Sequence, residues 1–514
     1  MTIKNSENLL NKLSISSDAF FKNGHFGIER ETLRVLDCSI SKLHHSSSLG
    51  SALCNKYITT DFSESLIELI TPPKTNKDEG FFLLDDLHHY VERNIDKETL
   101  WPFSMPPYID SEEDIRIANY GKSNDGLFKV LYRKGLSNRY GRLMQSIAGL
   151  HFNYSFSSHF WTLPIFERYT TSKPQLMEHI YMRAIRNINR LNWLILYFFG
   201  ASPVISENFF SEEIPGLKRK NDFFYSQYAT SFRMSSLGYQ PVSQNNLKIS
   251  FNSIDEYAKD LFMATNTISK DFQGISSLQN DEAKQINANI LQIEDEYYSV
   301  ARPKSNASNY KRMTSNLLKF GIDYIELRSL DLDPFSRTGI KRETIDFLEI
   351  FLIFCALSPS SQINSYERNQ IKHNEQLVSL DGRKPGINLI RDEKEITIKD
   401  WANEILDGME IVSDLLGKNR NIFNSYRSMA RDPDKTLSGE LLREMMQKNI
   451  GFHEMGGILA SKYKQEYLSI KPSENENWRL IEDHCFKSIK KQEEIENNDS
   501  GTFEDYVKNY FSDR

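Results

Sequence analysis

Cysteine is scarce in this chain: four residues among 514, far apart at Cys38, Cys54, Cys355 and Cys485. Their spacing matches neither a CxxC pair nor a metal-binding or disulfide framework. We therefore expect four separate thiols in a reducing compartment. An excess of basic residues is also missing, since the formal net charge is −7 and the pI is near 6. The composition thus gives no electrostatic footprint for nucleic acid.

Long apolar runs are absent as well. Runs such as 193–201 and 350–357 fall short of the roughly 20 residues that a membrane-spanning helix needs. The first residues are polar, and no apolar segment of the signal-peptide type follows them. These absences predict a soluble, cytoplasmic protein with no membrane or nucleic-acid partner.

The familiar nucleotide-binding and hydrolase motifs are also missing. The tripeptide Gly121-Lys122-Ser123 ends like a P-loop, but position 116 is Arg where that motif requires Gly. No GxGxxG follows a predicted strand, the HExxH pattern breaks after His453-Glu454, and GxSxG does not occur. A bound nucleotide would therefore have its phosphates held by metal ions and arginines.

Four stretches do carry acidic or histidine residues within the alternating apolar pattern of a strand, namely 27–34, 58–71, 149–156 and 324–331. In a strand, side chains two residues apart share a face. Glu29 and Glu31 therefore project together, as do Glu326 and Arg328. His151 lies on the polar face of an otherwise aromatic strand.

Glu68 stands out because apolar residues surround it in the run 66–70. A lone acid in such a run is rarely buried unless it is paired or bound to a metal. Asp61 lies seven residues earlier, and a fully extended strand would separate the two by roughly 23 Å. If both serve one site, the chain must bend between them.

Each of these residues has an ordinary explanation when taken alone. Glu29 and Glu31 could be surface carboxylates, Glu326 and Arg328 a structural ion pair, and His151 a buried histidine with a protein partner. Together, five acids and one histidine fit one polar sheet face, where crowded carboxylates raise one another's pKa unless a cation compensates them. Oxygen ligands with a single imidazole suit Mg²⁺ or Mn²⁺.

Arginines complete the pattern. Arg233 and Arg302 lie in strand or turn contexts, and the planar guanidinium fork of Arg suits carboxylates and phosphates. Taken singly, each is a surface cation by default. With Arg328 and the metal ligands they indicate phosphoryl transfer, in which catalysis consists mainly of positioning and charge neutralisation.

The coarse organisation is α+β, with strands forming one sheet that is flanked by helices. Helical spacing of apolar residues predicts helices at 78–93, 177–199, 255–269, 343–357 and 398–416. The stretch 487–514 is expected to be a charged helix with a short tail. We expect residues 1–514 to form a single catalytic unit, with a sheet-containing core at about 20–335 and a mostly helical region at about 336–514 packed on it.

Longer motifs resemble one known family, the bacterial glutamate–cysteine ligases (γ-glutamylcysteine synthetases) of the proteobacterial type. The resemblance covers about 26–457, and its motifs are 29–35 (ERETLRV), 58–62 (ITTDF), 104–106 (SMP), 132–133 (YR), 138–145 (NRYGRLMQ), 183–187 (RAIRN), 228–231 (YATS), 291–294 (LQIE), 302–304 (RPK), 324–331 (YIELRSLD) and 382–386 (GRKPG). It implies a glutamine-synthetase-like fold, in which a curved antiparallel sheet holds metals between ATP and the amino acids.

The resemblance also implies a reaction. ATP phosphorylates the γ-carboxylate of L-glutamate, and the amine of L-cysteine attacks the acyl phosphate to give γ-glutamylcysteine, ADP and phosphate, the first step of glutathione biosynthesis. The expected cofactor is Mg²⁺ with Mn²⁺ as a substitute, ATP is a co-substrate, and the enzyme is expected to be a monomer. One alternative is a related ligase that joins glutamate to another amine; a second is a cation-binding protein without catalysis.

Site residues follow from the same resemblance. The implied Mg²⁺ ligands are Glu29, Glu31, Asp61, Glu68, His151 and Glu326. Arg233 and Arg328 match residues facing the transferred phosphoryl group and the γ-carboxyl. The implied wall of the cysteine pocket comprises Phe62, Tyr132, Tyr239 and Tyr298. Arg133 and Arg302 are further candidates for contacts with phosphate or substrate.

Overall fold

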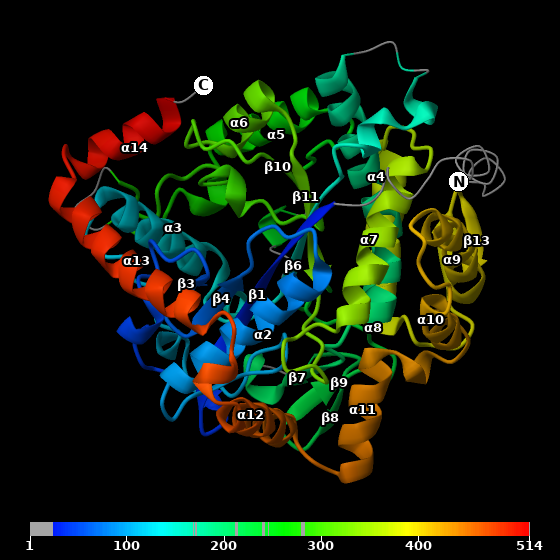
Figure 1. Cartoon of the computed structure of the whole chain (residues 1–514), viewed down its shortest axis with the longest axis horizontal. Helices are drawn as coiled ribbons and strands as arrows, with labels where there is room; N and C mark the ends of the chain where they lie inside the picture. Colours follow the sequence, from blue (N-terminus) through cyan, green and yellow to red (C-terminus); the bar gives the residue numbers. More distant parts are fainter. Residues whose placement is uncertain are drawn as a thin grey trace.

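A central antiparallel sheet organises the molecule (Figure 1). The computed structural model describes residues 24–512 except 168, 170–171, 211–213, 239–241, 245 and 279–282. Within this part the sheet has eight strands in the order β10–β11–β6–β1–β4–β3, with β2 and β5 also paired to β1. Their bounds are β1 His25–Leu36, β2 Ser39–Ile40, β3 Ile58–Thr60, β4 Leu66–Ile70, β5 Thr99–Leu100, β6 Leu150–Ser155, β10 Ala301–Lys304 and β11 Tyr324–Leu330.

The four predicted strand stretches all lie in this sheet, and one of them is divided. Residues 58–71 form the hairpin β3–β4, in which Thr59 pairs with Glu68. The side chains of Ile28, Phe152 and Tyr154 are buried on the face opposite the acids. Strand alternation therefore separates an apolar face from an acidic one, as the sequence predicted.

Helices cover the apolar face. α2 (Lys77–Asn94) contacts β1 and β4, α4 (Lys173–Phe199) contacts β10 and β11, and α7 (Arg342–Leu357) packs along α4. α4 begins four residues before the predicted start, because Gln175 accepts a hydrogen bond from the backbone N–H of Ser172 at 3.1 Å and closes a capping box there. On the acidic side lies α3 (Asn124–Tyr140), which the periodicity did not predict.

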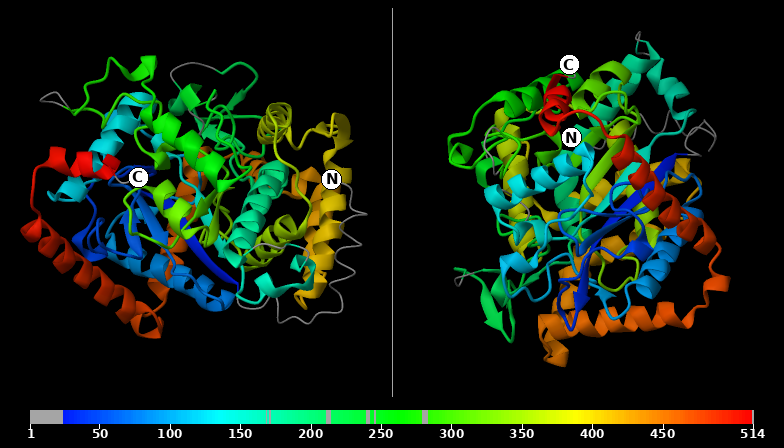
Figure 2. Two further views of the ribbon diagram at one scale, coloured as in Figure 1. Left: turned by 90° about the horizontal axis from the view of Figure 1, so that it is seen from above. Right: turned by 90° about the vertical axis from the view of Figure 1, so that its left-hand side faces the viewer.

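The region after residue 335 is mostly helical, as predicted. Its helices beyond α7 are α8 Ser365–Asp381, α9 Ile398–Leu415, α10 Ile422–Arg431, α11 Leu437–Lys448, α12 Phe452–Ser469, α13 Trp478–Asn498 and α14 Phe503–Ser512. α13 and α14 lie on the opposite side of the molecule from α9 (Figure 2). The prediction of a charged helix with a short tail at 487–514 is corrected in its second part: α13 ends at Asn498, the chain breaks where Gly501 has φ +85°, and residues 503–512 form the further helix α14.

The prediction of a single sheet is also wrong. A three-stranded sheet joins β7 (Val204–Ser206), β8 (Lys218–Lys220) and β9 (Phe223–Tyr225), and β12 (Asn388–Arg391) pairs with β13 (Lys394–Thr397). Asn221, Asp392 and Glu393 lie in the tight turns of these hairpins and have positive φ angles. Without the glycine that marks most such turns, the sequence signal was weak. Two further helices are α5 (Ile254–Asn266) and α6 (Met313–Phe320), and none of the described helices is long and apolar enough to cross a membrane.

Candidate active site

Strand register brings the predicted acids together. In an antiparallel pair, residues directly opposite each other point to the same face. Glu31 lies opposite Glu68, and Glu29 lies opposite His151. Glu326 lies opposite Asn153 on one side and Arg302 on the other. Acidic groups from β1, β4 and β11 therefore share one face with His151 of β6.

A cavity of about 230 Å³ lies over this face. It is lined by all six predicted metal ligands, by Phe62, Tyr132 and Tyr298 of the predicted aromatic wall, and by Arg133, Arg302 and Arg328. Tyr239 lies outside the described residues. Arg233 is the one described residue among those predicted that does not line this cavity.

The chain bends between Asp61 and Glu68, as a site shared by the two residues requires, and Asp61 therefore lines the cavity. It follows β3 directly, and its backbone N–H donates to the carbonyl oxygen of Leu66 at 2.9 Å, which closes the hairpin. The hydroxyl of Tyr120 donates to the Asp61 carbonyl oxygen at 2.9 Å, and Nε of Arg133 donates to the same oxygen. Arg133 therefore holds the backbone of the turn, and the Asp61 carboxylate remains at the cavity.

Three ligand-type groups are especially close. Nδ1 of His151 lies 3.2 Å from Oε2 of Glu29 and 3.6 Å from Oε1 of Glu326. One ligand atom from each of these three residues lies within 4.8 Å of the others, a spacing compatible with a shared cation. Glu31 lies beside them, with Oε1 3.6 Å from Nε2 of His151, and its Oε2 accepts a hydrogen bond from the N–H of Gly149 at 2.6 Å.

The acids of this face experience different electrostatic surroundings. Burial and the neighbouring carboxylates raise the pKa of Glu68 well above its ordinary value. Burial also opposes ionisation of Glu326, but Lys304 and Arg328 outweigh it and lower the pKa of that carboxyl far below the usual range. Oε1 of Glu326 accepts from Nη1 of Arg328 at 2.9 Å, and Nζ of Lys304 lies 3.9 Å from Oε2. Two cations therefore balance the charge of Glu326, whereas neighbouring carboxylates dominate the surroundings of Glu68.

The donor set fits a hard divalent cation. Oε2 of Glu326 and Oδ1 of Asn153 are buried and have no hydrogen-bond partner, although buried oxygens normally have one. Glu31, Asp61 and Glu68 add three further carboxylates to the lining of the same cavity. Oxygen ligands with one imidazole are a set that Mg²⁺ and Mn²⁺ accept.

Arg233 lies behind Arg328 in the structure. Its Nη2 donates to the carbonyl oxygen of Arg328 at 2.9 Å, and its Nη1 lies 3.6 Å from Asp331. A Cβ at Gly149 would lie 2.1 Å from Nη2 of Arg233, so this glycine permits the close approach of the guanidinium. Arg233 and Arg328 both line a second cavity of about 510 Å³, which shares Tyr298 with the first.

Several residues of the acidic cavity were not among the predicted site residues, namely Lys304, Leu136, Gln145, Asp295 and Glu296. Lys304 could have been found, because it lies two residues after Arg302 and therefore on the same face of β10. The others come from α3 and from turns, for which no strand parity applies.

Comparison with known proteins identifies the family. The family model described as glutamate-cysteine ligase matches residues 10–378. The chain belongs to this family. The resemblance in the sequence motifs is thereby confirmed, and the glutamate–cysteine ligase fold covers the sheet and α4 as well as the acidic cavity.

Curated relatives extend the match along the whole chain. A glutamate–cysteine ligase of Aliivibrio fischeri is 39% identical over 98% of both chains, and one of Aliivibrio salmonicida is 39% identical over 98% of both. Among solved structures, glutamate–cysteine ligase from Francisella tularensis in complex with AMP matches with a TM-score of 0.89 and 33% identity, covering 95% of this chain and 98% of that one. The α+β architecture of an antiparallel sheet with flanking helices is therefore that of a glutamate–cysteine ligase.

Proposed function

We propose that this protein joins the γ-carboxyl of L-glutamate to the amine of L-cysteine with consumption of ATP, through a γ-glutamyl phosphate. The products are γ-glutamylcysteine, ADP and phosphate. The observation that supports the phosphoryl-transfer step is the acidic cavity itself, where six candidate ligands face Arg302, Lys304 and Arg328. Metals and fixed cations together neutralise a transferring phosphoryl group.

Two groups of residues would hold Mg²⁺ on this face. Glu29, His151 and Glu326, whose ligand atoms lie within 4.8 Å of one another, would form the first group. Glu31, Asp61 and Glu68, which line the same cavity, would form the second. When bound, Mg²⁺ neutralises phosphate oxygens and orients the γ-phosphoryl group for transfer.

The chain's own cations direct the transfer. Arg328 is held by Glu326 at 2.9 Å and lines the cavity, where its guanidinium would add positive charge beside an acyl phosphate. Arg233, fixed by Asp331 and by the carbonyl oxygen of Arg328, braces that strand end from behind. Lys304 and Arg302 add positive charge on the neighbouring strand.

The aromatic wall would receive the cysteine. Phe62, Tyr132 and Tyr298 surround the cavity next to Asp61, and aromatic surfaces suit a small thiol side chain. Aromatic side chains at this wall would also limit the access of water to an acyl phosphate, which would otherwise hydrolyse. We further propose that the sheet corresponds to a glutamine-synthetase-like core and that residues 1–514 act as one monomeric unit.

The direct test is release of ADP by the purified protein with glutamate and a panel of amines: cysteine, 2-aminobutyrate, ammonia and a polyamine. Stimulation by cysteine and 2-aminobutyrate, with γ-glutamyl dipeptides as products, supports the proposal. Stimulation by ammonia or the polyamine alone would instead identify a related glutamate–amine ligase. No ADP release with any amine would refute both.

A further inference from the structure

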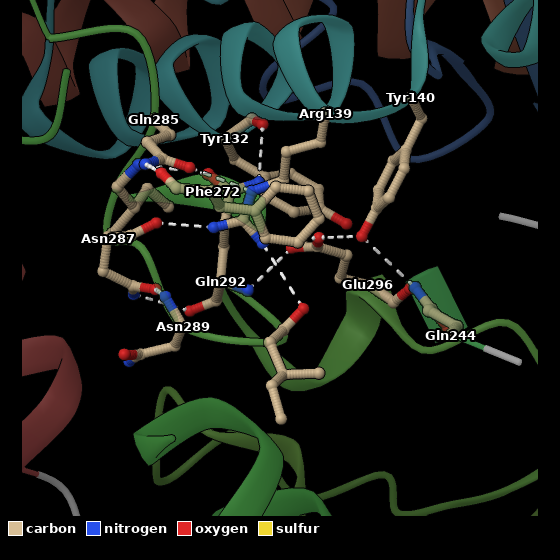
Figure 3. A network of polar contacts seen from close by, with 12 residues as sticks. Tyr132, Arg139, Tyr140, Gln244, Phe272, Gln285, Asn287, Asn289, Gln292 and Glu296 are labelled. Carbon is tan, nitrogen blue, oxygen red and sulfur yellow. Dashed lines mark hydrogen bonds and ion pairs between the residues drawn. The ribbon is translucent and has the colours of Figure 1, made fainter. Parts of the chain in front are cut away.

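A fully buried ion pair lies behind the aromatic wall of the cavity. It joins Arg139 of α3 to Glu296 of the 3-10 turn η10 (Glu294–Glu296), with Nη1 of Arg139 3.0 Å from Oε1 of Glu296. Neither side chain is exposed to solvent. Figure 3 shows the pair at the centre of polar contacts that connect α3 with the segment 285–296.

The Glu296 carboxylate accepts from three donors. Besides Arg139, Oε1 accepts from the hydroxyl of Tyr140 at 2.6 Å, and Oε2 accepts from the backbone N–H of Gln292 at 2.7 Å (Figure 3). Burial and Glu296 raise the pKa of Tyr140, so its hydroxyl remains a donor. Glu296 lines the cavity, but these three bonds make it a support and leave it unsuited to act as a base.

Arg139 uses the whole guanidinium fork. Its Nε donates to the side chain of Gln285 at 3.0 Å, and its Nη2 donates to the carbonyl oxygen of Asn287 at 2.5 Å. The ring of Phe272 stacks on it, with the ring centre 4.2 Å from Cζ. A lysine could keep the charge at this position but could not make these divergent contacts.

Two further contacts connect the ion pair to the predicted cysteine pocket. Nε2 of Gln292 donates to the carbonyl oxygen of Tyr132 at 3.3 Å. Gln244 donates to the carbonyl oxygen of Glu296 at 2.9 Å and accepts from the N–H of Tyr298 at 3.1 Å. Both tyrosines of the wall are thus tied to the turn that Glu296 holds.

We propose that Arg139 and Glu296 are positioning residues that set the affinity for the amine substrate. This inference rests on the proposed function. Because the candidate metal ligands of β1, β4, β6 and β11 are fixed by the sheet, loosening the turn displaces Tyr132 and Tyr298 while the metal ligands stay in place. Arg302 also donates to the carbonyl oxygens of Asp295 and Tyr297 beside Glu296, but its place in β10 is held by the pairing with β11. The pair therefore acts mainly on the cysteine side of the cavity.

The same turn contains a matched control. Nη2 of Arg312 lies 2.7 Å from Oε1 of Glu294, and both side chains are at most 4% exposed. Glu294 also accepts from the N–H of Thr314 at 2.8 Å, which ties it to α6. This second buried ion pair does not line the acidic cavity. The Glu294 carboxylate bonds Arg312 and Thr314, whereas the Glu296 carboxylate bonds Arg139, Tyr140 and Gln292. Loss of the Glu294 pair should therefore destabilise the fold to a similar degree and leave the contacts of Gln292 and Gln244 with the wall intact.

The experiment compares Glu296→Gln, Arg139→Lys and Glu294→Gln in the full-length protein. For each variant, kcat, the three KM values (cysteine, glutamate and ATP) and the Tm are measured. We expect Glu296→Gln and Arg139→Lys to raise the KM for cysteine at least tenfold and to leave the KM for ATP within twofold. Glu294→Gln should lower the Tm comparably and leave the KM for cysteine within twofold.

Two results would overturn the inference. One is an equal rise in all three KM values in Glu296→Gln, and the other is the same rise in the KM for cysteine in Glu294→Gln. If Glu296→Gln does not fold, Tyr140→Phe removes only one donor to Glu296 and should raise the KM for cysteine two- to fivefold; an unchanged KM contradicts the inference. If the wild-type protein does not turn over cysteine, the proposed function itself is refuted. That result is distinct from the two results above, which are differences between variants of an active enzyme.

Discussion

The variant Glu68→Gln should be more stable than wild type in the absence of metal and less stable than wild type in the presence of Mg²⁺. Glu68 faces Glu31 across a strand pair, where Cβ atoms lie about 5 Å apart. Two ionised carboxylates about 4 Å apart repel by roughly 4 kcal/mol at an effective dielectric constant of about 20. Burial and repulsion from Glu29, Asp61 and Glu31 raise the pKa of Glu68, so the folded protein without metal holds a proton there more tightly than the unfolded chain does.

The sign of the pH dependence follows from that proton. Above the unfolded-state pKa of about 4.3, unfolding releases it, so stability falls as the pH rises, by up to about 1.4 kcal/mol per pH unit for this group. The fall ends once the pH passes the raised folded-state pKa. In EDTA, the advantage of Glu68→Gln over wild type should therefore grow as the pH rises from about 5, until the pH passes the folded-state pKa of Glu68. Mg²⁺ at 100 times its Kd adds about 2.7 kcal/mol to wild type and less to the variant.

Urea unfolding at several pH values, in EDTA and in Mg²⁺, measures both effects. Glu92→Gln is the matched control, because burial raises the pKa of Glu92 to about 7 at a site outside the cavity. That variant should change the pH dependence and keep the full stabilisation by Mg²⁺. Equal Mg²⁺ stabilisation of wild type and Glu68→Gln would refute the reasoning.

Three further predictions concern catalysis and the C-terminal helices. Arg328→Lys keeps the positive charge but loses the planar guanidinium fork, so kcat should fall at least tenfold while the affinity for Mn²⁺ changes less than threefold. An unchanged kcat in steady-state assays would show that Arg328 takes no part in the transfer step. EDTA should abolish ADP release and added Mg²⁺ or Mn²⁺ should restore it, whereas full activity in EDTA contradicts a metal requirement. Burial opposes ionisation of Asp222, but hydrogen bonds from His453 and from the first N–H groups of α12 outweigh it and lower the pKa of Asp222 to about 2. Asp222→Asn should therefore lower the free energy of unfolding by about 1 kcal/mol at pH 7. This contribution is present above pH 4 and is lost as the pH falls toward 2, so identical urea midpoints for the two proteins at pH 7 would exclude it.

Much of the acidic face could be predicted because strand parity is a local property. Spacing predicts that Glu29 and Glu31 share a face of their strand and that His151 lies on the polar face of its own. A site shared by Asp61 and Glu68 requires a bend, because no straight strand could bridge their distance. Parity does not give register, however, so the pairing of Glu31 with Glu68 became visible only in the sheet.

The supports of the site could not be predicted because they join distant segments. Arg139 meets Glu296 across 157 positions, and neither residue lies in a strand with a readable alternation. Arg233 matched the family motif, but its place behind Arg328 depends on the close approach that Gly149 permits. Long-range contacts of this kind are set by the tertiary packing of turns and helices, for which sequence periodicity carries no signal.

The central claim, that the acidic sheet face holds divalent cations for phosphoryl transfer, is tested most directly by anomalous diffraction from crystals grown with Mn²⁺ and a non-hydrolysable ATP analogue. We predict one Mn²⁺ peak among Glu29, His151 and Glu326 and another among Glu31, Asp61 and Glu68. A well-ordered nucleotide with no Mn²⁺ peak within 3 Å of these side chains would contradict the account.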